Sequence, residues 1–369
     1  MPGPSSAVAL GELATVAEKF SAAAEANRRL SAEVAAGIVT AGFARHFVPA
    51  AHGGADSTFT ALTEALVPLA GRCASAAWCA QIYATSGRMA SFLPPRGRAE
   101  VWAAGPDVPI AAALTPTGTA TPADGGWVLS GRWHVLSGVD AAEWALLAAE
   151  TVGGQRFLAV EAAHYTVEDT WHPVGMRGTG SNSVLLDEVF VPVHRSFPRV
   201  ALVRGDAGAG AASRRAPLDA VAGLPFAAVV AGIAEHALGH WTESIAGQRS
   251  AGVAVRDTDA ARELFARAAL HTDVAGMLVA RAAAAADDAT ATARFAGRSR
   301  RDVAYVAELA RAVVDELFRA AGTRVQRSGH PLECAWRDVH AAASHLTLRT
   351  GPAAAGFAAQ NWPEEEETP

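Results

Sequence analysis

The feature that most constrains the fold of this chain is a strand-like middle region flanked by two alanine-rich helical regions. Between residues 110 and 200, short apolar runs such as Trp127-Val128-Leu129 are separated by glycine-bearing turns, a pattern that predicts strands. On both sides, apolar residues recur at helical spacing, as the leucines at 62, 66 and 69 do. Because strands and helices do not alternate, we exclude a doubly wound sheet and a (β/α)8 barrel.

The order of these regions predicts an α+β multi-domain fold. With 369 residues, half of them hydrophobic, the chain is long enough to bury a large core. We expect an N-terminal helical domain over residues 1–109, a middle β-barrel or sandwich over 110–204, and a C-terminal helical bundle over 205–369. The bundle is expected to follow a flexible connector at 205–217, to form four helices at 224–250, 257–288, 302–328 and 331–348, and to end in an acidic tail at 364–367.

Charge and cysteine content limit the partners that we expect. The formal net charge of -6 gives no reason to expect a nucleic acid or an anionic membrane as a partner. The three cysteines fit neither a metal-ligand spacing nor a disulfide framework, which predicts intracellular thiols and no metal site. Residues 1–30 do not resemble a secretory signal, and Gly223 and Pro225 interrupt the most apolar stretch. We therefore expect a soluble, cytoplasmic protein.

Two short segments could bind a ligand, although the common catalytic signatures are missing from this sequence. The segment from Gly175 to Ser183 combines glycines, hydroxyls and an arginine, which could hold a phosphate or the polar edge of a ring. The second segment is a strand with Trp133 that ends at Ser137-Gly138, where the hydroxyl could approach a flat ligand. An ordinary tight turn is an equally good interpretation of either segment.

A third segment places a histidine on a predicted helix that begins near Pro331. Asp338, the alanines at 341 and 342, and His345 follow the spacing i, i+3, i+4 and i+7, which predicts that they share one face. His340 points elsewhere. A histidine beside two alanines leaves room for a ligand, but a packed or surface histidine explains the pattern as well.

Taken together, these segments resemble the acyl-CoA dehydrogenase superfamily over nearly the whole chain. The resemblance implies an N-terminal helical domain, a middle β-barrel and a C-terminal four-helix bundle, in agreement with the order read from the patterns. It also implies a flavin between the last two domains, commonly across a subunit boundary, and hence a homo-oligomer, either a dimer or a tetramer. The segments that carry the resemblance are Ser130-Gly131-Arg132-Trp133 to Ser137-Gly138, Gly175 to Ser181 followed by Asp187 to Pro192, and Pro331-Leu332 to Trp336-Arg337-Asp338.

Two chemistries compete within this superfamily, and the position of the catalytic base separates them. Dehydrogenases need a carboxylate to take a proton next to a thioester carbonyl. By resemblance, that carboxylate would stand at Leu346 or near Pro225, and the nearest acid to Pro225 on its helix is Glu235, ten residues later. The sequence therefore resembles the group D branch, the two-component flavin-dependent monooxygenases. A thioester-desaturating FAD oxidoreductase is the alternative, and a catalytically silent family member is a third interpretation.

The monooxygenase resemblance implies a reaction and its partners. Reduced FMN or FAD from a separate flavin reductase would react with O2 to give a C4a-hydroperoxyflavin, which would hydroxylate a small aromatic or polycyclic metabolite. Oxygenation at nitrogen or sulfur stays open. His345 would serve as the substrate base, since an imidazole with an unperturbed pKa near ~6.5 can accept a phenol proton. Ser137 would contact N5 of the flavin.

The resemblance also assigns further residues around the two ligands. Near the substrate it suggests two aromatic residues of an early helix, for which a plain core position is the alternative. That helix has no histidine near Ser86, which favours a neutral aromatic substrate over a carboxylated phenol. The implied cofactor-binding residues are Trp133, Ser137, Gly138, Thr179, Ser181 and Arg249, the last reaching the phosphates of a partner subunit's flavin, and the implied substrate residues are Trp78, Tyr83 and His345.

Overall fold

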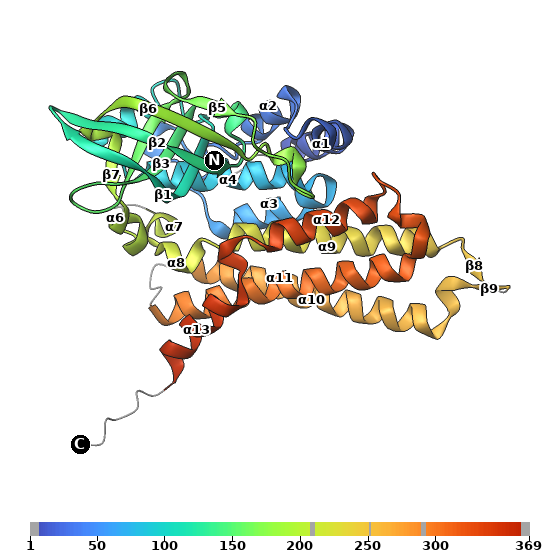
Figure 1. Cartoon of the computed structure of the whole chain (residues 1–369). Coiled ribbons are helices and arrows are strands. Elements are labelled where there is room, and N and C mark those ends of the chain that lie inside the picture. The colour runs from blue at the N-terminus through green and yellow to red at the C-terminus, as the bar shows by residue number, and fades with distance from the viewer. Residues whose placement is uncertain (1–6, 207–210, 251, 289–292, 363–369) are drawn as a thin grey trace, which may run out of the picture.

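The computed structural model describes residues 7–206, 211–250, 252–288 and 293–362. N-terminal helices, a β-sheet domain and long C-terminal helices follow one another along the chain, which confirms the predicted α+β order. In Figure 1, helices α3 and α4 run between the sheet and the C-terminal helices; α4 packs on both, and α3 packs on α4 and α9. The acidic tail at 364–367 lies outside the described residues.

The N-terminal region is helical, as its apolar spacing predicts. Leu62, Leu66 and Leu69 are fully buried on one face of α3. Side-chain caps begin two of the helices, since Ser31 accepts a hydrogen bond from the Val34 N–H and Thr58 accepts one from the Ala61 N–H. The helices are α1 (Ala7–Asn27), α2 (Ala32–Thr40), α3 (Phe59–Arg72), α4 (Ala74–Ala90) and α5 (Pro95–Val101), with a 3-10 turn η1 (Ala50–His52).

The middle region forms a seven-stranded sheet in the order β5-β6-β2-β1-β3-β4-β7. All neighbouring strands are antiparallel except β1 and β3. The sheet curls towards a barrel, because Trp127 Nε1 on β2 donates to Ser196 Oγ on β7 at 3.2 Å although three strands separate them in the sheet order. The strands are β1 (Ile110–Ala123), β2 (Gly126–Leu136), β3 (Trp144–Glu150), β4 (Arg156–Glu161), β5 (Thr166–Glu168), β6 (Asn182–Pro192) and β7 (Ser196–Pro198).

The C-terminal region contains the predicted four-helix bundle. Its first helix, α9, is buried along most of its length, because α3, α10, α11 and α12 all pack against it. The stretch 218–245 is long and apolar enough to span a membrane, but 72% of its apolar window is buried within the molecule, as in a core helix. The elements are α9 (Leu224–Ile245), the hairpin β8 (Arg249–Ser250) and β9 (Val253–Ala254), α10 (Asp259–Ala286), α11 (Ala293–Ala321), α12 (Pro331–Ala343) and α13 (Thr350–Asn361).

Four predicted helix ends are wrong. Helix α9 ends at Ile245 and not at residue 250, and α11 spans Ala293–Ala321 and not 302–328. Helix α12 ends at Ala343, because His345 has a non-helical ψ of 137° and caps a separate 3-10 turn, η8 (Leu346–Leu348). His345 therefore does not share a helix face with Asp338, contrary to the prediction from spacing.

The described part of the connector is also more ordered than predicted. It contains the short helix α7 (Ala212–Arg215) and lies between α6 (Arg199–Arg204) and α8 (Leu218–Val221). The buried guanidinium of Arg88 on α4 donates to the carbonyl oxygens of Ser213, Arg214 and Ala216, which fixes the connector to the N-terminal helices.

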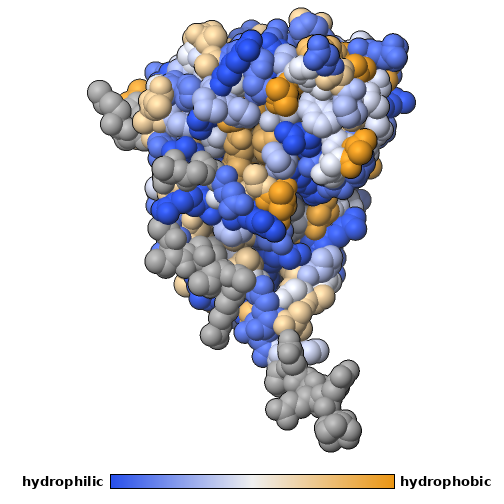
Figure 2. All heavy atoms as spheres, turned by 90° about the vertical axis from the view of Figure 1, so that its left-hand side faces the viewer, coloured by the Kyte–Doolittle hydropathy of each residue, from blue (hydrophilic) through white to orange (hydrophobic). Residues whose placement is uncertain are grey.

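Figure 2 shows the molecule from this end, where hydrophilic residues cover most of the face and hydrophobic ones form small separate groups.

Candidate active site

The candidate site begins where the end of β2 meets the loop that precedes β6. Trp133 on β2 pairs with Val184 and Leu136 with Asn182, so β2 has one more residue than β6 in this interval. Val135 lies in this bulge with a φ of 61°, which is unusual for a β-branched residue. A bulge turns the residues that follow it. Ser137 thereby comes to face the loop at 175–181.

Three hydroxyl groups from these two segments form a continuous hydrogen-bonded chain. Ser137 Oγ and Ser181 Oγ are 2.7 Å apart, and Ser181 Oγ and Thr179 Oγ1 are also 2.7 Å apart. At one end, Trp78 Nε1 donates to Ser137 Oγ at 3.0 Å, and at the other Thr179 Oγ1 donates to the Met176 carbonyl at 2.9 Å. All three hydroxyl residues are buried.

The two ends of this chain determine the direction of every bond in it. A hydroxyl group has one proton, and Thr179 uses its proton on the Met176 carbonyl, which can only accept. Ser181 must then donate to Thr179, and Ser137 must donate to Ser181. Since Ser137 already accepts from Trp78, its remaining capacity is a single lone pair. Ser137 can therefore only accept a hydrogen bond from a bound ligand.

An aromatic cluster adjoins the hydroxyl chain through the same indole. The Trp78 ring contacts the Phe226 ring with centroids 4.6 Å apart and meets the His345 imidazole edge-on at 5.7 Å. Phe226, on the first turn of α9, stacks on His345 at 4.0 Å with 24° between the ring planes. Trp78 is buried, whereas Phe226 and His345 are partly exposed. Helices α4 and α9 and the turn after α12 thus bring three rings together in one cluster.

Phe226 was not predicted from the sequence to belong to the site. Phe226 directly follows Pro225, where some dehydrogenases have their base. The search for a carboxylate at this position was therefore the signal that could have drawn attention to Phe226. Its importance depends on His345, which lies over a hundred residues later in the chain. No local pattern in the sequence connects the two.

The environment of His345 keeps its imidazole neutral. Burial lowers the pKa of His345 to about 4, and the positive charge of Arg349 acts in the same direction. Its Nδ1 is 2.8 Å from Thr347 Oγ1 and accepts a hydrogen bond from the Thr347 backbone N–H at 3.4 Å. At neutral pH the ring therefore carries one proton.

The loop that bears Thr179 and Ser181 is held against α12. The Asp338 carboxylate accepts a hydrogen bond from the Met176 N–H at 2.5 Å. A Cβ atom on Gly175 would lie 2.2 Å from the Arg337 carbonyl oxygen, so only glycine permits this close approach. The predicted Arg337-Asp338 pair thus positions the loop, although neither of its side chains belongs to the hydroxyl chain.

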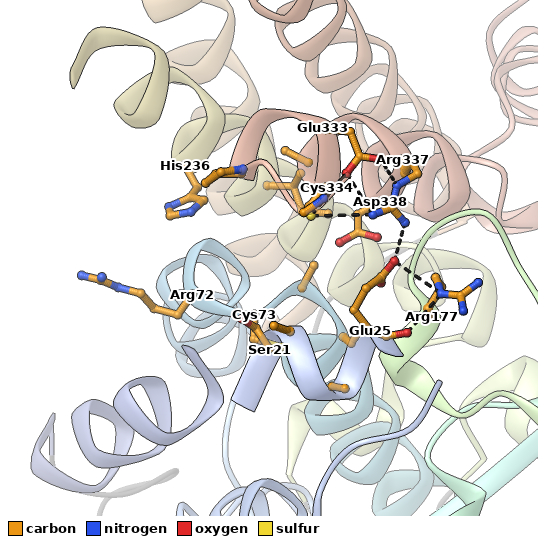
Figure 3. Close-up of a pocket in the computed structure, with 18 of the residues that line it drawn as sticks. Ser21, Glu25, Arg72, Cys73, Arg177, His236, Glu333, Cys334, Arg337 and Asp338 are labelled. Carbon is orange, nitrogen blue, oxygen red and sulfur yellow. Dashed lines mark hydrogen bonds and ion pairs between the residues drawn. The ribbon is translucent and has the colours of Figure 1, made fainter. Parts of the chain in front are cut away.

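A cavity lined by described residues lies on the other side of this contact. It has a volume of about 800 Å³ and is lined by residues of α1, α9, α12 and their neighbours, with none of the predicted flavin or substrate residues among them. Figure 3 shows Glu25 between Arg177 and Arg337, with Arg337 also paired to Glu333. The paired charged groups that line this cavity thus largely neutralise one another.

Asp338 faces this cavity as well. Burial raises the pKa of the Asp338 carboxyl to about 6, while its hydrogen bond from Met176 works against that rise. Asp140 is the carboxylate nearest to Ser137-Gly138 in the sequence. It accepts hydrogen bonds from the Asn182 side-chain amide at 3.2 Å and lies 3.9 Å from the Arg29 guanidinium. Both carboxylates are therefore engaged in holding the loops.

The remaining predicted residues lie in different surroundings. Tyr83 is buried beneath Gly138 and donates to its carbonyl oxygen at 2.7 Å. Trp133 is fully buried inside the sheet, where its Nε1 donates to the Ala148 carbonyl at 2.6 Å. Arg249 is exposed in the β8–β9 hairpin, which Figure 1 shows at the end of the bundle away from the sheet. The other predicted residues, Trp78, Ser137, Gly138, Thr179, Ser181 and His345, form one cluster.

Comparison with known proteins gives a consistent result. Residues 224–350 match the model of the acyl-CoA dehydrogenase C-terminal domain. The chain is 31% identical to the oxygenase component of an FADH2-dependent resorcinol hydroxylase from Rhizobium sp., with 92% of this chain and 90% of that protein covered. This chain belongs to the two-component flavin-dependent monooxygenases. Like other oxygenase components of this family, it is an oxidoreductase with the acyl-CoA dehydrogenase fold.

Solved structures extend the similarity of this oxygenase component to the whole fold. The 3-HSA hydroxylase from Rhodococcus sp. RHA1 has a TM-score of 0.89 and 25% identity, with 95% of each chain covered. XiaF from Streptomyces sp., solved with FADH2 and glycerol, has a TM-score of 0.89 and 29% identity, with 98% of this chain and 97% of that chain covered. The predicted order of N-terminal helices, a central β region and C-terminal helices is thus shared with these solved structures.

Proposed function

We propose that this oxygenase hydroxylates a small aromatic or polycyclic metabolite, using O2 and reduced FMN or FAD from a partner flavin reductase. One observation carries the proposal: Trp78 hydrogen-bonds Ser137 through its indole N–H and contacts His345 with its ring. A cofactor group at Ser137 and a substrate group at His345 would therefore be neighbours. The relative that hydroxylates resorcinol, an aromatic diol, supports the same substrate class.

The hydroxyl chain suits the reduced form of the cofactor. N5 of a reduced flavin bears a hydrogen, whereas N5 of an oxidised flavin does not, and Ser137 offers a lone pair without a free proton. When bound, the reduced flavin supplies two electrons to O2, so that one oxygen atom enters the substrate and the other leaves as water. Thr179 and Ser181 act on the flavin through Ser137, by fixing the direction of its hydrogen bond.

The rest of the cofactor site follows from the same proposal. Tyr83 supports the Gly138 backbone from below, and Trp133 holds the end of β2 by packing inside the sheet. Arg249 lies in the β8–β9 hairpin, at the end of the bundle away from the sheet. It would reach the flavin phosphates of a partner subunit in a dimer or tetramer. We place this assembly in the cytoplasm.

The substrate would lie against the aromatic cluster. Trp78 and Phe226 offer flat apolar faces on which an aromatic ring can pack and from which water is excluded. His345 would contact the oxygen substituent of the ring and make the ring a better nucleophile. A thioester-desaturating activity is less well supported, because an exposed Leu346 and a buried Pro225 occupy the two positions expected for a carboxylate base.

The proposal is tested with photoreduced FMN or FAD, O2, and a panel of resorcinol, phenol and 2-naphthol. We expect hydroxylated product from at least one phenol, and product plus H2O2 together should account for the flavin oxidised. Ser137→Ala should shift this balance towards H2O2, and His345→Leu should bind reduced flavin normally but lose product. Formation of H2O2 alone with every phenol, or anaerobic bleaching of bound FAD by an acyl thioester, would reject the proposal.

A further inference from the structure

Thr347 contacts the His345 imidazole at its Nδ1 atom. The His345 Nδ1 atom lies 2.8 Å from Thr347 Oγ1 and also accepts the Thr347 backbone N–H, which begins the η8 turn. A backbone N–H can only donate, so Nδ1 must present its lone pair to it. The threonine hydroxyl can then donate to the same atom. Both contacts therefore favour an Nδ1 without a proton.

The other ring nitrogen of His345 is free to meet a ligand. Stacking on Phe226 and the edge-on contact with Trp78 fix the plane of the imidazole. Among the residues that the structure describes, Nε2 has no hydrogen-bond partner, and it is not among the buried atoms that lack one. Since a neutral imidazole has one N–H, and Nδ1 does not bear it, the proton belongs to Nε2.

We propose that Thr347 holds His345 in the Nε2–H tautomer, so that the oxygenase presents a hydrogen-bond donor, and not a base, to its substrate. The inference rests on the proposed function and deepens it, by stating how His345 activates the ring. The matching substrate class is a phenolate, or a ring with another exposed acceptor oxygen. Thr347 is a positioning residue, since it acts through His345.

The proton balance of this arrangement differs from that of base catalysis. A phenol loses its hydroxyl proton to solvent on binding, and the negative oxygen accepts a hydrogen bond from Nε2–H, which favours the ionised form of the phenol. The phenolate ring is more electron-rich than the phenol ring, so the donor achieves the activation expected of a base. The low pKa of His345 agrees, because burial disfavours the imidazolium that proton transfer to the ring would create.

The tautomer is measured directly by 15N NMR of the histidine-labelled protein without flavin. The His345 signals are identified by their loss in His345→Gln, while His330, whose Nδ1 accepts the Leu332 N–H, provides an internal reference for the same tautomer. We expect a protonated Nε2 and an unprotonated Nδ1 in the native protein. Thr347→Val should raise the fraction with a protonated Nδ1, and Thr347→Ser should restore the native spectrum. A protonated Nδ1 in the native protein would overturn the proposal.

A second experiment separates donation from proton acceptance by using 4-nitrophenol, whose ionised form is coloured. At a pH where free 4-nitrophenol is mostly protonated, binding to the native protein should generate the phenolate absorbance. Asn and Gln at position 345 can donate an N–H but cannot take up the proton, so the better of these two variants should bind within a few-fold of the native protein. His345→Leu should weaken binding by about 10- to 100-fold, as expected for loss of a hydrogen bond to a charged group.

The outcomes separate this inference from the proposed function. If both amide variants bind 4-nitrophenol as weakly as His345→Leu, the donor role is wrong. Neither the NMR nor the binding experiment requires flavin, O2 or turnover. Failure of hydroxylation with a normal tautomer and normal phenolate binding would therefore count against the proposed function alone.

Discussion

Ser137 illustrates how a neighbouring side chain can decide what a hydroxyl group offers to a ligand. By itself a serine hydroxyl can donate or accept. In this protein the Trp78 indole donates to it and Ser181 receives its proton, which leaves one lone pair. The proposed preference for a reduced cofactor therefore depends on Trp78 as much as on Ser137.

Trp78→Phe is expected to weaken that preference. The phenylalanine ring still packs on Phe226, but without the indole N–H the Ser137 hydroxyl can rearrange, and an oxidised flavin becomes a better ligand. Loss of one neutral hydrogen bond should narrow the ratio of the Kd values for oxidised and reduced flavin by about 5-fold. Anaerobic titration with both forms measures this ratio.

A matched control is Trp127→Phe, which removes an indole N–H from β2 that donates to Ser196. This change should leave the Kd ratio at the native value. An unchanged ratio in Trp78→Phe, with both flavin forms still bound, would contradict the role given to the hydroxyl chain.

At the scale of elements, the contact between α12 and the 175–181 loop determines where Thr179 and Ser181 lie. The Asp338 carboxylate accepts the Met176 N–H, and Gly175 touches the Arg337 backbone. This contact joins a helix of the bundle to a loop of the sheet domain. A small increase in the distance between α12 and the loop should therefore displace Thr179 and Ser181.

Gly175→Ala is expected to push the loop away from α12, because the new methyl group would overlap the Arg337 carbonyl. Such overpacking destabilises proteins by about 1–3 kcal/mol, which urea unfolding would detect. Reduced flavin should also bind more weakly. Gly153→Ala is the control, since a Cβ atom there meets nothing within 4 Å. Equal stability and flavin affinity of the two variants would show that the contact does not position the loop.

For the whole molecule, the position of Arg249 predicts that a complete site needs two subunits. Arg249 is exposed in the hairpin beyond α9, whereas Ser137 directly follows β2 of the sheet. If Arg249 binds the phosphates of a partner's flavin, His345→Leu and Arg249→Ala remove different halves of each site. Symmetric assemblies place equivalent surfaces in contact, so the two losses can be combined in one mixed assembly.

Mixing these two inactive variants should therefore restore activity. After unfolding and refolding at equal concentrations, half of the dimeric units are mixed, and one of the two sites in each mixed unit is intact. Hydroxylation should recover to about a quarter of the native rate by this symmetry argument. The variants refolded separately are the controls. No recovery, although mass spectrometry shows mixed assemblies, would place Arg249 outside the partner's site.

Much of the fold and half of the site were predictable, because their signals are local. The helical spacing of Leu62, Leu66 and Leu69, and the alternation of short apolar runs with glycine turns, depend on the periodicity of single elements. Ser137 and the 175–181 loop stood out for the same reason, as hydroxyls and glycines close together in the sequence. The end of α12 was missed, since the helical spacing continues through His345, whereas in the structure His345 caps a separate turn by accepting the Thr347 N–H.

The sequence by itself determined the order of helices, strands and helices, and it supplied the hydroxyls, the histidine and the missing carboxylates. Only the tertiary structure decided which of these groups meet and which protons remain for a ligand. Phe226 acquires its role from the fold, because it stacks on a histidine more than a hundred residues later in the chain, whereas Thr347 contacts that histidine locally, within the turn that follows α12. Hydrogen bonding is the reason: whether a group donates or accepts depends on its partners in space, and distant parts of a chain become partners only when it folds.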